Sequence, residues 1–243
     1  ELDGFAFPLE QFAARFEPVA RPRRIEWRLH LSDRRLRMAV MVSRQAHCLY
    51  DILARWESGE WPIELSLVLS NHDDHRGLVE RHGLPFHHIP VEAATKAEAE
   101  DRQIALLKQA NVDFIVLARY MQILGPSFVQ TFPMRILNIH PSILPAFPGI
   151  AAWKQALDAG VKISGCTVHF VDSGTDSGPI ILQRSVTVHD HDTPESLHAR
   201  IQIEEHIVYP EALRLLQAGS IHVVDNRRVV IRKAARNRSE LLQ

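Results

Sequence analysis

Two polar residues, Asn138 and His140, form the strongest candidate for chemistry in this chain. They lie at the end of a short apolar run at 136–139, which predicts a strand, and residues two apart on a strand share a face. Pro141 follows and ends the ladder of hydrogen bonds. An amide N–H can stabilise a developing oxyanion, and an imidazole can move a proton. The pair therefore suits attack on a carbonyl carbon from which a nitrogen departs.

The same spacing also fits an ordinary structural role. Asn138 would then cap a loop, and His140 would be a buried histidine whose hydrogen bonds are satisfied within the protein. Spacing alone slightly favours this structural interpretation, so the residue pattern leaves both open.

A loop of small residues at 173–179, Ser-Gly-Thr-Asp-Ser-Gly-Pro, is the second candidate. Such residues permit tight turns and a close approach of the backbone to a ligand. Its carboxylate, Asp176, could orient His140 or activate a water molecule. An ordinary turn, in which Asp176 bonds to its own backbone, fits the pattern better. His169, on the strand before this loop, fits a structural histidine of the sheet.

The other histidines and the two cysteines give weaker signals. The chain has 14 histidines, and two clusters lie in polar loops at 72–75 and 189–192. Neither cluster has HExxH spacing, so we expect no metal site. Cys48 and Cys166 are too few for a thiolate zinc cage, and burial in a helix is the expected role of Cys48.

Alternating strands and helices surround the candidate residues. Continuous apolar or short alternating runs predict strands at 38–42, 65–69, 86–91, 114–118 and 136–139. Helices are expected between them at 46–56 and 96–110. This order predicts an α/β fold with a doubly wound, mostly parallel sheet and helices on both faces. Asn138 and His140 would then lie at the carboxyl edge of a strand, where such sheets place their sites.

The pattern changes after Pro148. A helix at 151–160 precedes two close strands at 166–171 and 180–188, which indicates an antiparallel pair at one end of the sheet. Thr193 is a suitable N-cap for a long helix that runs to about residue 216. The segment 221–231 resembles a hairpin.

The first thirty-one residues form a separate piece. A helix is expected at 8–20 and a short strand at 25–29, with a polar linker at 32–35. One helix and one strand cannot bury both of their faces, so residues 1–31 are predicted to be part of a larger unit. The apolar face at 8–29 is expected to pack on a neighbouring subunit, which predicts a homo-oligomer.

Composition excludes several classes of protein. The net charge of −1 over 243 residues provides no strong field for nucleic acid or an anionic membrane. No apolar run approaches the ~20 residues that span a bilayer, and the first residues lack the pattern of a signal peptide. We therefore expect a cytoplasmic protein. Neither GxGxxG nor GxxxxGKS is present, so the usual phosphate cradles are missing.

The segment 138–145, Asn-Ile-His-Pro-Ser-Ile-Leu-Pro, with a Gly-rich loop that carries Asp176, resembles the folate-dependent formyltransferase and hydrolase family. This joint signature is specific and outweighs the structural interpretations given above. The resemblance implies that Asn138, His140 and Asp176 are the catalytic trio. It also implies a binding site for the formyl donor, lined by Met121, Gln122, Ile123, Leu124, His169, Gly174 and Thr175.

The first half of the chain resembles one branch of this family, the formyltetrahydrofolate deformylases. The matching stretches lie at 42–49, 69–73, 86–91, 96–100 and 117–122. The segment 1–31 resembles the end of the ACT regulatory domain of that branch. This division gives an ACT-like remnant at 1–31 and a catalytic domain at 37–243.

The second half departs from that branch. Pro141 stands where deformylases usually have a second histidine. Stretches at 147–149, 165–170 and 199–206 look more like glycinamide ribonucleotide transformylase, in which the glutamate that matches Glu205 helps to hold the acceptor amine. The chain is a mosaic of the two branches.

The loop after the first strand of the sheet separates the two branches. A transformylase needs a Gly/Ser-rich phosphate loop there, whereas this chain has Ser-Arg-Gln-Ala-His at 43–47. Arg44 and His47, with Glu205, could still form an acceptor or anion site. The resemblance favours hydrolysis of 10-formyltetrahydrofolate to tetrahydrofolate and formate, with no permanently bound cofactor and a small-molecule folate as partner. The alternatives are a glycinamide ribonucleotide transformylase and a folate-binding protein without turnover.

Overall fold

The computed structural model describes residues 11–25, 35–225 and 227–232. The chain divides into two compact units between Arg34 and Arg35. In the first unit, α1 (Phe12–Ala20) leads into a 3-10 turn, η2 (Arg21–Arg23). The helix expected at 8–20 is therefore found from residue 12, and the strand expected at 25–29 lies, apart from Ile25, outside the described residues. The ACT-like character of this segment stays a prediction.

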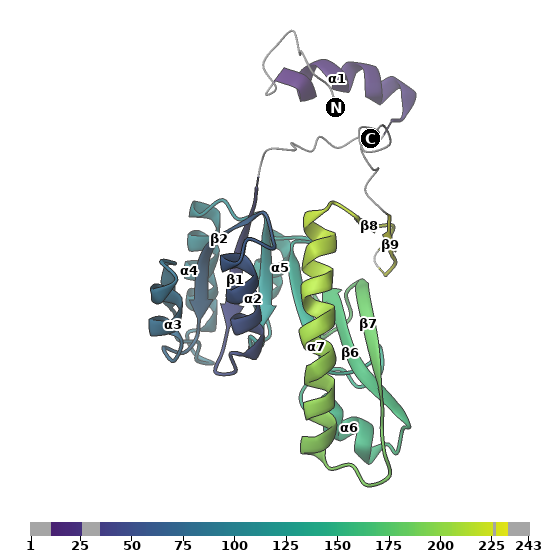
Figure 1. Cartoon of the computed structure of the whole chain (residues 1–243). Helices are drawn as coiled ribbons and strands as arrows, with labels where there is room; N and C mark the ends of the chain where they lie inside the picture. The colour runs from purple at the N-terminus through teal and green to yellow at the C-terminus, as the bar shows by residue number, and fades with distance from the viewer. Residues whose placement is uncertain (1–10, 26–34, 226, 233–243) are drawn as a thin grey trace, which may run out of the picture. The chain divides into compact units, whose positions relative to one another are not determined.

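A seven-stranded sheet in the order β3-β2-β1-β4-β5-β6-β7 forms the second unit (Figure 1). The first five strands are parallel, β6 is antiparallel to β5, and β7 is antiparallel to β6. The predicted mostly parallel sheet with an antiparallel pair at its end is confirmed. The strands are β1 (Leu36–Val42), β2 (Ile63–Ser70), β3 (Phe86–His88), β4 (Phe114–Ala118), β5 (Ile136–His140), β6 (Ile163–Phe170) and β7 (Ile180–Thr187).

Helices cover both faces of this sheet, as the doubly wound prediction requires. Alternate residues of β1 point to opposite sides, so that Met38 and Val40 enter one apolar core and Ala39 and Met41 enter the other. The first core is closed by α2 (His47–Glu57), α3 (Arg76–Arg81), α6 (Ala152–Asp158) and α7 (Pro194–Gln217). The second is closed by α4 (Lys96–Gln109) and α5 (Pro126–Thr131).

Several predicted boundaries need correction. The strand expected at 86–91 ends at His88, because Pro90 has no N–H to give to the ladder. The strand expected from residue 166 begins at Ile163, where pairing with Thr187 extends the ladder. Helix α3 was not predicted, since its six residues are too few to show a helical pattern. The long helix begins after Thr193 as expected, and Thr193 and Ser196 form a capping box.

The expected hairpin at the end of the described chain is also found, as β8 (Ile221–Val223) paired with β9 (Val229–Ile231). Among the described helices, none combines the length and the apolar character needed to cross a bilayer.

Ser43, which follows β1, forms hydrogen bonds with residues that follow β2 and β4. Its N–H donates to the carbonyl of Arg119 (3.3 Å), and its hydroxyl donates to Asn71 Oδ1 (2.7 Å). The same hydroxyl accepts the N–H of Met121 at 2.9 Å. Since β2 and β4 flank β1, the connections here diverge to opposite sides of the sheet, and such switch points form crevices for ligands.

Helix α7 runs beside the sheet in the direction opposite to β1 (Figure 1). The hydroxyl of Tyr209 contacts the carbonyls of Leu117 on β4 (3.0 Å) and Leu137 on β5 (3.2 Å). Glu205 lies one helical turn before Tyr209, toward the carboxyl edge of these strands. The fold thus brings a carboxylate from the C-terminal helix to the switch point.

Candidate active site

Asn138 and His169 face each other across the antiparallel pair of β5 and β6. The amide Nδ2 of Asn138 donates to Nε2 of His169 at 3.2 Å, and Nδ1 of His169 donates to the carbonyl of Phe170 at 2.8 Å. Burial lowers the pKa of His169, so its ring is neutral and Nε2 is free of a proton. An amide has two N–H donors. His169 therefore fixes the orientation of Asn138 and leaves its second N–H for a ligand.

His140 lies between two acceptors. Its Nδ1 is 3.2 Å from Oδ2 of Asp176, and its Nε2 donates to the carbonyl of Phe147 at 2.9 Å. The side chains of His140 and Asp176 are only 5% and 14% exposed. A histidine can donate to both neighbours only when each ring nitrogen carries a proton. The imidazole and the carboxylate thus lie within hydrogen-bond distance of each other, which is the geometry that proton transfer between two groups requires.

The carboxylate of Asp176 is positioned by another loop and not by its own turn. Its Oδ2 accepts the N–H of Gly149 at 2.8 Å, and its Oδ1 is 3.7 Å from Nε2 of His169. The structure contradicts the expectation that Asp176 bonds to its own backbone. Asp172 has that role instead, since its Oδ1 accepts the N–H of Gly174 and the hydroxyl of Ser177.

A close contact between two backbone segments determines the path of the loop at 173–179. A Cβ atom on Gly178 would lie 1.9 Å from the carbonyl oxygen of Phe170. Asp176 itself has a φ of +50°, in the left-handed region that aspartate tolerates better than most residues. These two features let the loop turn back so that Asp176 reaches His140.

The residues expected to line the formyl-donor site are at the surface. Met121 and Ile123 are 54% and 69% exposed, Gly174 and Thr175 are exposed, and Gln122 and Leu124 are half-buried. In the described part of the chain, no hydrogen bond joins any of these six residues to Asn138, His140 or Asp176. Among the residues expected at the donor site, the structure therefore links only His169 directly to the trio.

The loop that carries Met121 is anchored at both ends by α4. Glu100 accepts the N–H of Gly125 at 2.9 Å, and Gln103 donates to the hydroxyl of Tyr120 at 3.0 Å. Burial raises the pKa of Tyr120 to about 12, so this hydroxyl stays protonated. The exposed apolar side chains of 121–123 are thus presented on a fixed loop.

The residues proposed for an acceptor or anion site divide into two groups. His47 Nε2 lies 3.1 Å from Oε2 of Glu205, whose side chain is fully buried. Arg44 is exposed and points to His72 instead, at 3.5 Å. Sequence reasoning missed Arg119, whose Nη1 is 4.0 Å from Oε1 of Glu205. Its position directly after β4, at the switch point, is the sequence feature that could have indicated Arg119 as a site residue.

Neither cysteine has the character of a nucleophile. Both are free thiols and buried. Burial raises the pKa of Cys48 well above its ordinary value and that of Cys166 to about 12. The expectation that Cys48 is buried in a helix is confirmed, since it lies in the first turn of α2 at 4% exposure.

The chain is similar in sequence to known formyl transferases. A sequence profile described as formyl transferase matches residues 36–213. A formyltetrahydrofolate deformylase of Synechocystis sp. is 41% identical over 230 residues, which cover 95% of this chain and 81% of the relative. The deformylase of Bacillus subtilis is 41% identical and covers 89% and 72% of the two chains.

Solved structures include both branches. The formyltetrahydrofolate deformylase of Pseudomonas syringae superposes with a TM-score of 0.88 and 37% identity, over 94% of this chain and 76% of that chain. The glycinamide ribonucleotide transformylase 1 of Symbiobacterium toebii superposes with a TM-score of 0.76 and 41% identity, over 84% and 98% of the two chains.

Proposed function

The chain belongs to the formyl transferase family, and on that premise we propose that it hydrolyses 10-formyltetrahydrofolate to tetrahydrofolate and formate. The observation that carries the proposal is the 41% identity to a formyltetrahydrofolate deformylase over 95% of this chain. The match extends beyond the catalytic region at 36–213 into residues that precede it. The gathering of Asn138, His140 and Asp176 around one point supports the same chemistry.

The first step is attack of water on the formyl carbon. As the new C–O bond forms, the pair of Asp176 and His140, 3.2 Å apart, accepts the proton of the water. The carbonyl oxygen becomes an oxyanion, which the second N–H of Asn138 and the protonated ring of His140 stabilise. Such stabilisation typically contributes ~10²–10³ in kcat for each donor.

The second step is collapse of the tetrahedral intermediate. The bond between the formyl carbon and N10 breaks, and N10 leaves with the electron pair and takes the proton held by His140 and Asp176. Formic acid and tetrahydrofolate result, and the acid ionises to formate by releasing its remaining proton to solvent, so atoms and charges balance without a redox partner. In this mechanism His140 and Asp176 hold one proton between the two steps, and Asn138 and His140 direct two hydrogen-bond donors toward the oxyanion.

The carbonyl of Phe147 must give way before His140 can face the substrate. This carbonyl accepts from Nε2 of His140 at 2.9 Å. The hydroxyl of Ser142 lies 3.2 Å from the same carbonyl but makes its shorter bond, 2.6 Å, to the carbonyl of Ala146. Rotation of this hydroxyl toward Phe147 would replace the bond from His140 when His140 turns to the formyl oxygen, at the expense of the bond to Ala146.

Glycinamide ribonucleotide transformylase is the second candidate, favoured by the 41% identity to the Symbiobacterium toebii enzyme. Two features weigh against it. The loop at 43–47 has no glycine to approach a phosphate, and the carboxylate of Glu205 is already engaged by His47 and faced by Arg119. Only Oε2 of Glu205 is engaged at hydrogen-bond distance, so the missing glycine is the stronger of the two arguments.

One assay separates these functions. Formate release from 10-formyltetrahydrofolate is measured with and without glycinamide ribonucleotide. Hydrolysis predicts the same rate of formate release in both, whereas loss of the formyl group only with the ribonucleotide, without free formate, would establish a transformylase. Folate binding without turnover, unchanged by His140→Ala, would establish a binding protein.

Membership of the family also leads us to propose a domain division, a cellular location and an oligomeric state. Residues 37–243 form the catalytic domain, and residues 1–31 belong to an ACT-like unit. The enzyme works in the cytoplasm without a permanently bound cofactor. Val19 and Ile25 of the first unit are 45% and 46% exposed, which supports a homo-oligomer, and light scattering of the purified chain measures its mass.

A further inference from the structure

Three side chains that the proposed hydrolysis does not use meet between α2 and α7. They are His47 and Cys48, from the first turn of α2, and Glu205, from the middle of α7. Nε2 of His47, Sγ of Cys48 and a carboxylate oxygen of Glu205 all lie within 4.8 Å of one another. Nitrogen, sulfur and oxygen donors of these kinds are ligands for metal ions.

The carboxylate of Glu205 gives an independent sign that a ligand is missing. Its side chain is fully buried, and its Oε1 accepts no hydrogen bond from any described residue. The nearest cation, Arg119 Nη1, is 4.0 Å from Oε1, beyond hydrogen-bond distance. A buried carboxylate oxygen without a donor is costly, and each such group in a native protein calls for an explanation.

The distances between the three side chains fit tetrahedral coordination of a metal ion after a small movement of the Cys48 sulfur. His47 Nε2 and Glu205 Oε2 are 3.1 Å apart, and at ordinary zinc bond lengths they would subtend about 97° at the metal. A tetrahedral sulfur would lie about 3.6 Å from the nitrogen, so Cys48 Sγ has to move by at most about 1.2 Å. A hollow of about 10 Å³, the lower limit for one water molecule, adjoins Cys48 and Glu205; its lining is otherwise Asp51 and mostly apolar side chains of α2 and α7, and it does not include His47.

We propose that His47, Cys48 and Glu205 bind a divalent ion of the zinc type, with water in the fourth position. The mixed nitrogen and sulfur donors favour Zn²⁺ or Co²⁺ over Mg²⁺ and Ca²⁺, which prefer oxygen ligands. Three protein ligands and one open position are the pattern of a zinc site accessible to small molecules. The proposal is independent of the proposed hydrolysis.

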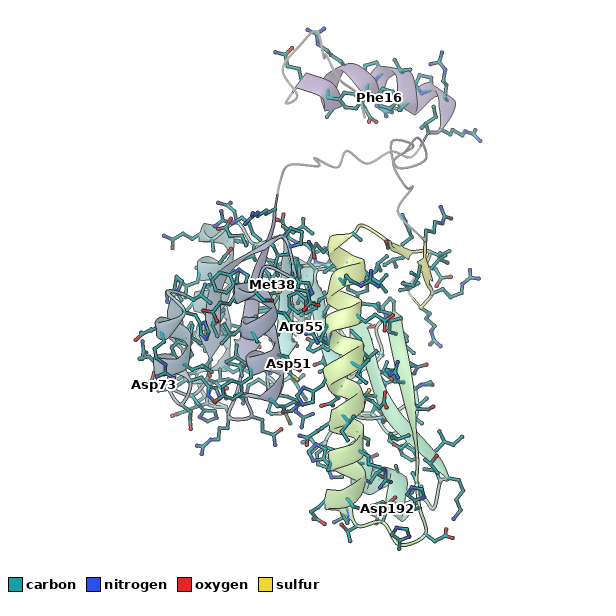
Figure 2. All side chains as sticks on the ribbon, in the orientation of Figure 1. Phe16, Met38, Asp51, Arg55, Asp73 and Asp192 are labelled. Carbon is teal, nitrogen blue, oxygen red and sulfur yellow. The ribbon has the colours of Figure 1, made fainter. Side chains whose placement is uncertain are left out.

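Local charges are compatible with this assignment. The ion displaces the thiol proton of Cys48 to solvent, so one thiolate and one carboxylate neutralise its two positive charges. Arg119 faces Glu205 from the sheet, and Asp51 lies between α2 and α7, where it contacts Nδ1 of His206 (Figure 2). These two outer charges have opposite signs. The two charges of the ion are thus matched by its own ligands, and Asp51 is paired with His206.

Cobalt titration tests the proposal, because Co²⁺ is a visible probe of zinc sites. The purified chain is stripped with a chelator and titrated with Co²⁺ alone. We expect one equivalent to bind with the visible bands of a tetrahedral site and a sulfur-to-cobalt charge-transfer band in the near ultraviolet. Cys48→Ser should abolish the charge-transfer band, whereas Cys166→Ser, which changes the other buried cysteine, should retain it.

A second variant covers the case in which Cys48→Ser does not fold. His47 is only partly buried, so His47→Ala should keep the native circular dichroism and bind Co²⁺ at least tenfold more weakly. Absence of a charge-transfer band in the native chain overturns the proposal, and so does its survival in a folded Cys48→Ser variant. Unchanged affinity in His47→Ala also overturns it. Since the readout does not involve turnover, failure of the proposed hydrolysis would leave this result intact.

Discussion

Oδ2 of Asp176 lies 3.2 Å from Nδ1 of His140 and at the same time accepts the N–H of Gly149 at 2.8 Å. The carboxylate is thus held from two directions by residues that are 36 and 27 positions away in the sequence. A side chain fixed in this way needs little reorganisation when it receives a proton, which is the property that acid–base catalysis requires.

Asp176→Asn and His140→Ala should each lower kcat for formate release by ~10²–10⁴, because both remove a member of the proton-transfer pair. The matched control is Asp190→Asn, which changes an aspartate whose side chain is 88% exposed and paired with Lys162. Formate release by stopped assay, with circular dichroism to verify folding, measures the effect. Activity of Asp176→Asn equal to that of Asp190→Asn would contradict the assigned role.

Asn138→Ala should lower kcat by ~10²–10³ with a small change in KM, because the lost N–H acts mainly on the oxyanion. His169→Gln should lower kcat less, since it acts by orienting the amide of Asn138. A double-mutant cycle checks this relation: in the Asn138→Ala background, His169→Gln should have almost no further effect. Additive losses would show that His169 acts separately.

The free energy of unfolding should decrease as the pH falls below about 6.5, and His169 should account for part of this decrease. Burial lowers the pKa of His169 below its ordinary value of 6.5. As the pH falls through that value, the unfolded chain takes up a proton that the folded chain does not, so the free energy of unfolding decreases. The slope is at most about 1.4 kcal/mol per pH unit, and it ends at the folded pKa.

Urea unfolding at pH about 7.5 and about 5.5 measures this effect. The His169→Gln variant should lose less stability between the two pH values than the native chain, since glutamine does not titrate. His189→Gln, on the exposed loop before α7, is the control and should follow the native chain. Equal pH dependence in all three proteins would show that His169 is not the responsible group.

Gly178→Ala should reduce activity at least tenfold and should also lower the free energy of unfolding. The added methyl group would meet the carbonyl oxygen of Phe170 at 1.9 Å, so the loop that carries Asp176 has to shift. Displacement by about an ångström typically costs on the order of 10² in rate. Gly77→Ala is the matched control, because the nearest atom to its added methyl is the end of Arg81 at 3.7 Å.

Tyr209→Phe should lower the free energy of unfolding by about 1–3 kcal/mol, since the carbonyls of Leu117 and Leu137 lose a buried donor. Tyr50→Phe, at a position 56% exposed, should change it by less than about 0.5 kcal/mol. Denaturant titration of the two variants measures the difference. Equal stabilities would show that the hydroxyl does not hold α7 to β4 and β5.

The sheet was predictable because its strands are short continuous apolar runs, and the strand at 114–118 was located to the residue. The shared face of Asn138 and His140 followed from the two-residue period of a strand. Helix α3 escaped prediction because six residues, with apolar side chains only at Leu78 and Val79, are too few to show a helical stripe. Its stability comes from packing of Val79 against the core, which is a tertiary effect.

The contacts within the site could not be obtained from sequence alone. Residue types indicated that Asp176 could orient His140, but only the fold shows that Gly149 holds it there. The pairing of Glu205 with His47 joins positions 158 residues apart. This pairing depends on where α7 crosses the carboxyl edge of the sheet, and local sequence patterns do not predict that crossing. Arg119 was overlooked for the same reason, because its role depends on its distance from Glu205 on α7.

The boundary between β4 and β5 has a consequence for recombination between relatives. Only backbone rungs at 115–117 and 136–138 join these strands in the ladder, and such rungs are indifferent to side-chain identity. A chain that inherits its two halves from different ancestors can therefore join them here. The condition is that α7 still matches α2, with Glu205 beside His47 and His206 beside Asp51. Compatibility of a hybrid enzyme would be decided at that helix pair and by the packing of β4 and β5 side chains in the two shared cores.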